Sequence, residues 1–118
     1  MKRFFLLSAM LMCMVTFMPA QSDANRKKAA EYQREAEYYQ KQAASHYREA
    51  EYYLQKAKNY QKEEEYYIRH SDYDKARTYS EYKKKEMDKY RTELRLASQA
   101  EDKAATYRRW AADALRSN

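Results

Sequence analysis

Two histidines are the residues of this 118-residue chain best suited to acid–base or metal chemistry near neutral pH. His46 has Glu49 one helical turn away, and His70 precedes Asp72 and Asp74. A metal site needs several such ligands that converge on one point. Because 18 acidic residues are spread along the chain, an acidic neighbour carries little information. We therefore predict structural roles for both histidines and no bound metal.

The chain also lacks the residue patterns of common nucleophilic and phosphate-binding sites. It contains no glycine, so no glycine loop can cradle a phosphate. Its single cysteine, Cys13, lies in a segment that we expect to be removed. A two-helix body offers no deep pocket that would perturb a pKa. We predict no catalytic residue, no cofactor and a function that is not enzymatic.

Basic residues form three short clusters, at residues 26–28, 83–85 and 108–109. Acidic residues are interleaved with them along the chain, so each cluster is one part of a mixed charged surface. Nucleic acid is therefore not an expected partner. The segment Arg108, Arg109 and Trp110 joins two cations to an amphipathic ring, which is typical of residues that lie at a membrane surface. These three residues are the candidate surface anchor.

Tyrosine is the most unusual feature of the composition, with 14 copies. Tyr38, Tyr52 and Tyr66 recur every 14 residues, each as one member of a Tyr-Tyr pair. Adjacent residues of a helix point about 100° apart, so these three rings lie on a different face from their neighbours. Tyrosine is enriched among the residues that dominate interface energetics. We predict that Tyr38, Tyr52 and Tyr66 form an interaction stripe.

The helix that must carry this stripe is indicated by an internal repeat. The sequence Arg-Glu-Ala-Glu-Tyr-Tyr at residues 34–39 recurs unchanged at residues 48–53 and loosely at residues 62–67. Its period of 14 residues is two heptads, which predicts a long helix with one buried seam. Small alanines on that seam let two helices approach closely, and aromatic rings fill the flanking space. The predicted seam consists of Ala29, Tyr32, Ala36, Tyr39, Ala43, His46, Ala50, Tyr53, Ala57, Tyr60 and Tyr67.

One plausible break interrupts the helical pattern, between residues 68 and 74. Arg69 and His70 are cations suited to the C-terminus of a helix, whereas Ser71 is a good N-cap for the next one. The pattern predicts a first helix over about 26–69, a turn over about 70–72 and a second helix over about 72–116. Because no glycine marks the stop, the alternative is one helix that runs straight through these residues. The apolar stripe of the second helix is weaker, since Lys83 and Glu101 interrupt it.

Residues 67–79 resemble the turn and second-helix start of a tetratricopeptide repeat, with Ser71 in place of the usual glycine. The flanking helices lack that family's Trp, Leu and Gly positions, so the resemblance implies a helix–turn–helix geometry rather than membership. Two arms of nearly equal length across a short turn predict an antiparallel hairpin. The expected fold is all-α, a coiled-coil-like helical hairpin over residues 21–118.

The first 20 residues have the pattern of a secretory signal peptide. Lys2 and Arg3 precede an apolar run over residues 4–17, and Pro19-Ala20 follow it. The run is short for a membrane span. We predict cleavage after Ala20, with an uncleaved signal anchor as the alternative. Cleavage would lower the net charge from +6 to +4, because Lys2 and Arg3 leave with the signal.

These features predict an exported protein, located in the periplasm or outside the cell. The first expected function is a structural or protein-interaction role in the cell envelope, in which helical faces bind another copy or another envelope protein. The alternative is a binder of anionic envelope polymer or of a membrane surface. A further alternative is an accessory subunit of a secretion or conjugation apparatus.

Overall fold

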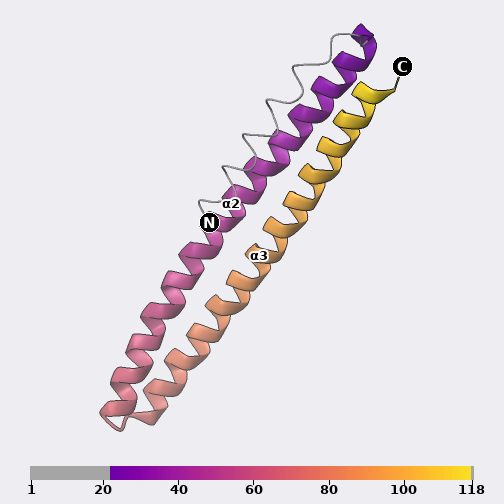
Figure 1. Cartoon of the computed structure of the whole chain (residues 1–118). Helices are drawn as coiled ribbons and strands as arrows, with labels where there is room; N and C mark the ends of the chain where they lie inside the picture. Colours follow the sequence, from indigo (N-terminus) through magenta and orange to yellow (C-terminus); the bar gives the residue numbers. More distant parts are fainter. Residues whose placement is uncertain (1–21, 118) are drawn as a thin grey trace. The chain divides into compact units, whose positions relative to one another are not determined.

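The structure is a computed structural model of the chain, and it describes residues 22–117. This part of the chain contains two helices, α2 over Asp23–Arg69 and α3 over Tyr73–Arg116 (Figure 1). The prediction of an all-α fold made of two long helices in a hairpin is confirmed. The predicted signal peptide, residues 1–20, lies outside the described residues.

Helix α2 begins at an N-cap that the sequence analysis did not identify. The Ser22 hydroxyl oxygen accepts a hydrogen bond from the backbone N–H of Asn25 at 3.2 Å, and its carbonyl accepts one from Arg26 at 3.0 Å. Asp23 adds negative charge to the first turn, where the helix dipole favours it. The helix therefore begins at Asp23 rather than near residue 26.

The chain leaves α2 through a Schellman motif. The backbone N–H of Ser71 donates to the carbonyl of Ile68 at 3.1 Å, and that of Asp72 donates to Tyr67 at 2.9 Å. These two bonds define the motif, in which the residue after the helix adopts a left-handed conformation. Ser71 does so, with a φ of 57°. The prediction of Ser71 as the N-cap of the second helix is therefore wrong, because Ser71 terminates the first.

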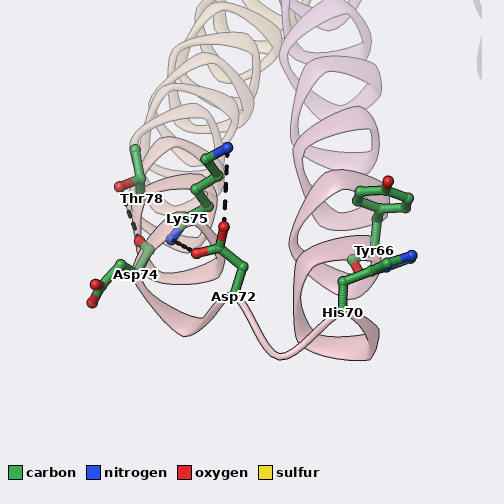
Figure 2. Close-up of polar contacts among 6 residues, drawn as sticks. All are labelled: Tyr66, His70, Asp72, Asp74, Lys75 and Thr78. Carbon is green, nitrogen blue, oxygen red and sulfur yellow. Dashed lines mark hydrogen bonds and ion pairs between the residues drawn. The ribbon is translucent and has the colours of Figure 1, made fainter.

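Asp72 is the N-cap of α3 instead (Figure 2). Its carboxylate accepts a hydrogen bond from the backbone N–H of Lys75 at 3.3 Å, and its carbonyl accepts one from Ala76 at 3.1 Å. On the other side of the turn, His70 Nδ1–H donates to the carbonyl of Tyr66 at 2.8 Å. That bond satisfies one of the last carbonyls of α2. The turn is thus closed without glycine.

The described residues form two compact units, and each helix contributes one segment to each unit. The turn unit comprises residues 38–103, and the terminal unit comprises residues 22–37 together with residues 104–117. Within each unit, the segment of α2 packs antiparallel to the segment of α3 with alanines between them. The buried alanines are Ala43, Ala50, Ala57, Ala76, Ala97 and Ala100 in the turn unit, and Ala29, Ala36, Ala104, Ala111 and Ala114 in the terminal unit.

Alanine dominates the buried positions of both units, since the remaining buried hydrophobic residue among those described is Leu115. A methyl group buries little area, so the larger apolar contacts must come from the tyrosine rings beside it. Neither helix, over residues 22–117, has an apolar stretch that could cross a bilayer.

Candidate interaction surfaces

The structure places the aromatic members of the predicted seam at the edges of the buried alanines. The five seam alanines are at most 3% exposed. The rings beside them are half-buried, namely Tyr32, Tyr39, His46, Tyr53, Tyr60 and Tyr67. Alanine therefore lets the helices come close, and the rings cover the sides of the contact.

The Tyr-Tyr pairs of α2 repeat one ring geometry in the turn unit. In each pair the two rings meet edge to face, an arrangement that aromatic quadrupoles favour. The ring centroids lie 5.2 Å apart in Tyr38–Tyr39, 5.4 Å apart in Tyr52–Tyr53 and 5.1 Å apart in Tyr66–Tyr67. Each outer ring is thus held against an inner ring.

Each inner ring also faces a lysine from α3. The Nζ atoms lie within the range of cation–π attraction from the ring centroids. The distances are 5.3 Å for Lys103 to Tyr39, 5.6 Å for Lys89 to Tyr53 and 5.3 Å for Lys75 to Tyr67. These three lysines are themselves 14 residues apart, as the tyrosine pairs are.

The lysines belong to a second repeat, in α3, which the sequence analysis missed. The pattern Asp-Lys-x-x-Thr occurs at residues 74–78, 88–92 and 102–106. Thr78 and Thr92 donate their hydroxyls to the carbonyls of Asp74 and Asp88, at 3.2 and 3.0 Å (Figure 2 shows the first). Equal periods in antiparallel helices bring a lysine to every tyrosine pair of the turn unit. A search of the second arm for repeated charges, rather than for apolar residues, would have found this pattern.

Charged residues also lie at the edges of the seam in the turn unit. His46 Nδ1 lies 2.6 Å from Glu93 Oε2, so the partner of His46 comes from α3 and not from its sequence neighbour Glu49. Lys83 Nζ lies 3.4 Å from Glu64 Oε1, and both side chains are mostly buried. Lys83, which interrupts the apolar stripe of α3, is therefore matched by a carboxylate on α2.

Glu86 is the buried acid of the turn unit, with 7% of the residue exposed. Its Oε1 lies 3.6 Å from Lys89 Nζ, the same ammonium that faces the Tyr53 ring. Its Oε2 has no hydrogen-bond partner. The lysine therefore links a buried carboxylate to an aromatic face.

Glu101, the second interruption of the α3 stripe, has a phenol as its partner. Burial raises the pKa of Tyr47 above its ordinary value of 10.0, and the hydrogen bond that Tyr47 donates to Glu101 raises it further. Over residues 22–117 there is no cluster of three or more His, Cys, Asp or Glu that could hold a metal ion. His46, Lys83 and Glu101 thus each have a partner on the other helix.

The outer rings of the tyrosine pairs are open to solvent. Tyr38 is 55% exposed, Tyr52 54% and Tyr66 46%. The Tyr66 ring lies 4.2 Å from the ring of His70. Lys56 Nζ lies 5.0 Å from the Tyr52 ring centroid, and a side-chain hydrogen bond with Tyr52 raises the pKa of Lys56.

These three rings belong to a continuous exposed surface, the outer face of α2. Positions alternately three and four residues apart lie on one side of a helix. Every position of this series is exposed: Tyr38, Lys41, Ser45, Arg48, Tyr52, Gln55, Asn59, Lys62, Tyr66 and Arg69. The face contains no carboxylate, and its four cations form no ion pair within the part of the chain that is described. Glutamates flank it on both sides.

The candidate surface anchor lies in the terminal unit. Arg109 and Trp110 are exposed, Trp110 to 45%, whereas Arg108 is half-buried. The indole ring packs edge to face on Tyr32 at 5.8 Å and on Tyr107 at 5.2 Å. An open hollow of about 450 Å³ lies beside it. Trp110 therefore also contributes to the packing of its own unit.

Comparison of the chain with protein families, curated proteins and solved structures found no match. The proposals below therefore rest on the sequence pattern and on the geometry of these surfaces.

Proposed function

We propose that this chain is an exported, non-enzymatic interaction protein of the cell envelope, which binds a helical protein surface through the outer face of α2. One observation carries the proposal: Tyr38, Tyr52 and Tyr66 are about half exposed, at equal spacing, on a face without carboxylates. Fourteen residues of helix span about 21 Å, so the three rings form a ladder about 42 Å long.

Each ring of this ladder packs against another ring of the same chain. Each outer ring rests edge to face on an inner ring, and each inner ring faces a lysine of α3. An ordered side chain loses less conformational entropy on binding. Tyrosine also combines a large apolar surface with a hydroxyl that can hydrogen-bond at an interface. These properties favour a protein partner.

Crosslinking in native cell envelopes tests this proposal. The variant Tyr38→Gln/Tyr52→Gln/Tyr66→Gln should lose most crosslinked species, because it removes the ladder while leaving the alanine seam intact. The control is Tyr73→Gln, since Tyr73 is 62% exposed but lies on α3. If the triple variant keeps every crosslinked partner, the stripe is exposed tyrosine without a binding role.

Export is supported by the charged, apolar and small-residue segments of residues 1–20. Intact mass of the protein recovered from cells should correspond to a chain that begins at or just after Gln21. Recovery of a full-length, membrane-embedded chain would contradict cleavage and favour a signal anchor.

An anionic polymer or membrane surface is the second candidate partner, favoured by the exposure of Trp110 beside Arg109. Binding to vesicles of anionic lipid should then depend on Trp110 and weaken steeply with salt. Vesicle binding that is unchanged in Trp110→Ala would contradict this candidate.

A further inference from the structure

We propose that the partner of the outer face of α2 is the outer face of α3 in a second copy of this chain. The inference rests on the proposed function and names the partner. The chain itself carries a face whose charges and spacing complement those of the tyrosine ladder.

The outer face of α3 is also continuous and exposed. It consists of Asp74, Thr78, Glu81, Lys85, Asp88, Thr92, Arg95, Gln99 and Asp102. Three aspartates recur on it every 14 residues, the spacing of the tyrosines on the outer face of α2. Both ladders therefore have steps of about 21 Å.

The charges of the two faces are inverted at two places on each helix. In α2, Arg48 and Lys62 are each followed one and three residues later by flanking glutamates. In α3, Asp74 and Asp88 are each followed at the same distances by flanking cations. The order is Arg48, Glu49, Glu51 in α2 and Asp88, Lys89, Arg91 in α3. At these positions, each face presents at its centre and edges the charges that the other requires.

One antiparallel register satisfies the whole ladder. When Tyr52 lies opposite Asp88 of the second copy, Tyr66 lies opposite Asp74 and Tyr38 opposite Asp102, because both periods are 14 residues. Each phenol can then donate to a carboxylate. Arg48 and Lys62, four residues before Tyr52 and Tyr66 on the same face, add a cation beside the carboxylate.

The same charges disfavour other occupants of the α2 face. Two α2 outer faces packed together would align glutamates along both edges of the contact. A polyanion laid along α2 would meet those flanking glutamates as well. The outer face of α3 avoids both conflicts, since its flanks carry Lys75, Arg77, Lys89 and Arg91.

This contact is heterologous, because it joins two different faces. When two copies are joined, one keeps its α3 outer face free and the other keeps its α2 outer face free, so the contact can be repeated from copy to copy. The expected product is a row of chains that grows with protein concentration.

Charge exchange tests the pairing. One variant, Asp74→Lys/Asp88→Lys, makes both outer faces basic, and the other, Arg48→Glu/Lys62→Glu, replaces the two α2 cations beside the aspartates with carboxylates. The purified wild-type chain should sediment faster as concentration rises, whereas each variant alone should keep the monomer value. An equimolar mixture of the two variants should recover association. The unchanged α2 face of the aspartate variant meets the unchanged α3 face of the other variant, and the two altered faces meet with their charges exchanged. Helicity of each variant, measured by circular dichroism, checks that it is folded.

Two results would overturn the inference. A wild-type chain that stays monomeric at high concentration excludes the second copy as partner. Association that persists in Asp74→Lys/Asp88→Lys places the contact elsewhere than on the α3 face. The proposed function is tested separately, by the crosslinks of the tyrosine triple variant. If this variant loses its crosslinks to other envelope proteins, the proposed function stands after either result. If it keeps them, the proposed function fails.

Discussion

The terminal unit and the turn unit each have a core of buried alanines, and they close the edges of these cores with different chemistry. In the terminal unit, Tyr32, Tyr107 and Trp110 contact one another with ring centroids 5.2–6.2 Å apart, next to buried Leu115. In the turn unit, tyrosines alternate with ionic pairs such as Lys83–Glu64. One unit is closed by an aromatic cluster, and the other by a series of polar contacts between its helices.

The difference between the two kinds of edge bears on the register of the helices. A seam of alanine and aromatic residues repeats every seven residues, so two such helices could slip by one heptad and still match. The turn unit excludes this slip. Its lysines face tyrosines only at every second heptad, and at the heptad between them Tyr60 faces Tyr82 at 5.5 Å. The period of 14 residues therefore fixes a register that apolar packing leaves open.

The largest expected effect tests the alanine core of the turn unit. Ala50 is 1% exposed, so Ala50→Leu should force the helices of the turn unit apart. Overpacking of this kind should lower the free energy of unfolding by roughly 2–3 kcal/mol, measured by urea denaturation. Ala44→Leu is the matched control, because Ala44 is only half-buried. Equal losses at both positions would mean that the helices are not closely packed.

Removal of the indole tests the aromatic edge of the terminal unit. Trp110→Ala loses two edge-to-face contacts and should lower stability by about 1–2 kcal/mol. Amide hydrogen exchange should accelerate in residues 22–37 and 104–117 while the turn unit keeps its protection. Tyr73→Ala, at a 62% exposed position, should have little effect. Faster exchange throughout both units would show that they unfold together.

The ion pair Lys83–Glu64 tests the polar edge of the turn unit. Glu64→Gln leaves Lys83, whose side chain is 28% exposed, without its carboxylate partner. We expect a loss of about 1 kcal/mol, because a partly buried charge without a partner is unfavourable. The double variant Glu64→Leu/Lys83→Met should recover most of it. A double variant less stable than Glu64→Gln would show that the pair itself is strongly stabilising.

The sequence predicted the fold from its strongest periodicity, since five alanines in heptad register favour a close helix–helix contact over a solvated single helix. The polar contacts were harder to foresee. Lys83 and Glu101 were read as interruptions because their partners, Glu64 and Tyr47, lie on the other helix. The sequence of one helix does not determine its register against a second helix. The Asp-Lys-x-x-Thr repeat can be found in the second helix alone, but its contact with the tyrosine pairs follows only when the two repeats are aligned antiparallel.

The turn was predicted at the right residues but with the wrong cap. Ser71 and Asp72 are both good N-caps, and local preference alone does not choose between them. The choice follows from the end of α2, where the Schellman motif requires one residue with positive φ before the chain reverses. Ser71 fills that position although a side chain disfavours it. The absence of glycine from the chain concealed the signal.

Ser71→Gly should therefore stabilise the turn unit. Glycine adopts a φ of 57° without the steric penalty of a Cβ atom. The free energy of unfolding should rise by about 0.5–1 kcal/mol, seen as a higher midpoint of denaturation. Ser71→Ala keeps the Cβ atom and should give no gain. A destabilised Ser71→Gly would mean that the serine side chain supports the turn in another way.

The smallest expected effect concerns the hydrogen bond between Tyr47 and Glu101, which should make the stability of the turn unit depend on pH. Burial and the hydrogen bond to Glu101 raise the pKa of Tyr47 above 10.0, so the fold favours the protonated phenol. That contribution is fully present below pH 10 and is lost as pH rises further, because the unfolded chain releases the proton more readily. The stability of the wild type should thus fall more steeply above pH 10 than that of Tyr47→Phe. Near pH 7 the variant should be less stable by about 0.5–1 kcal/mol, since Glu101 loses a hydrogen bond.

Urea denaturation at several pH values between 7 and 11 measures both effects. The terminal unit variant Trp110→Ala is the control, and its pH profile should run parallel to that of the wild type. Parallel profiles for wild type and Tyr47→Phe would show that this phenol titrates alike in the folded and unfolded chains.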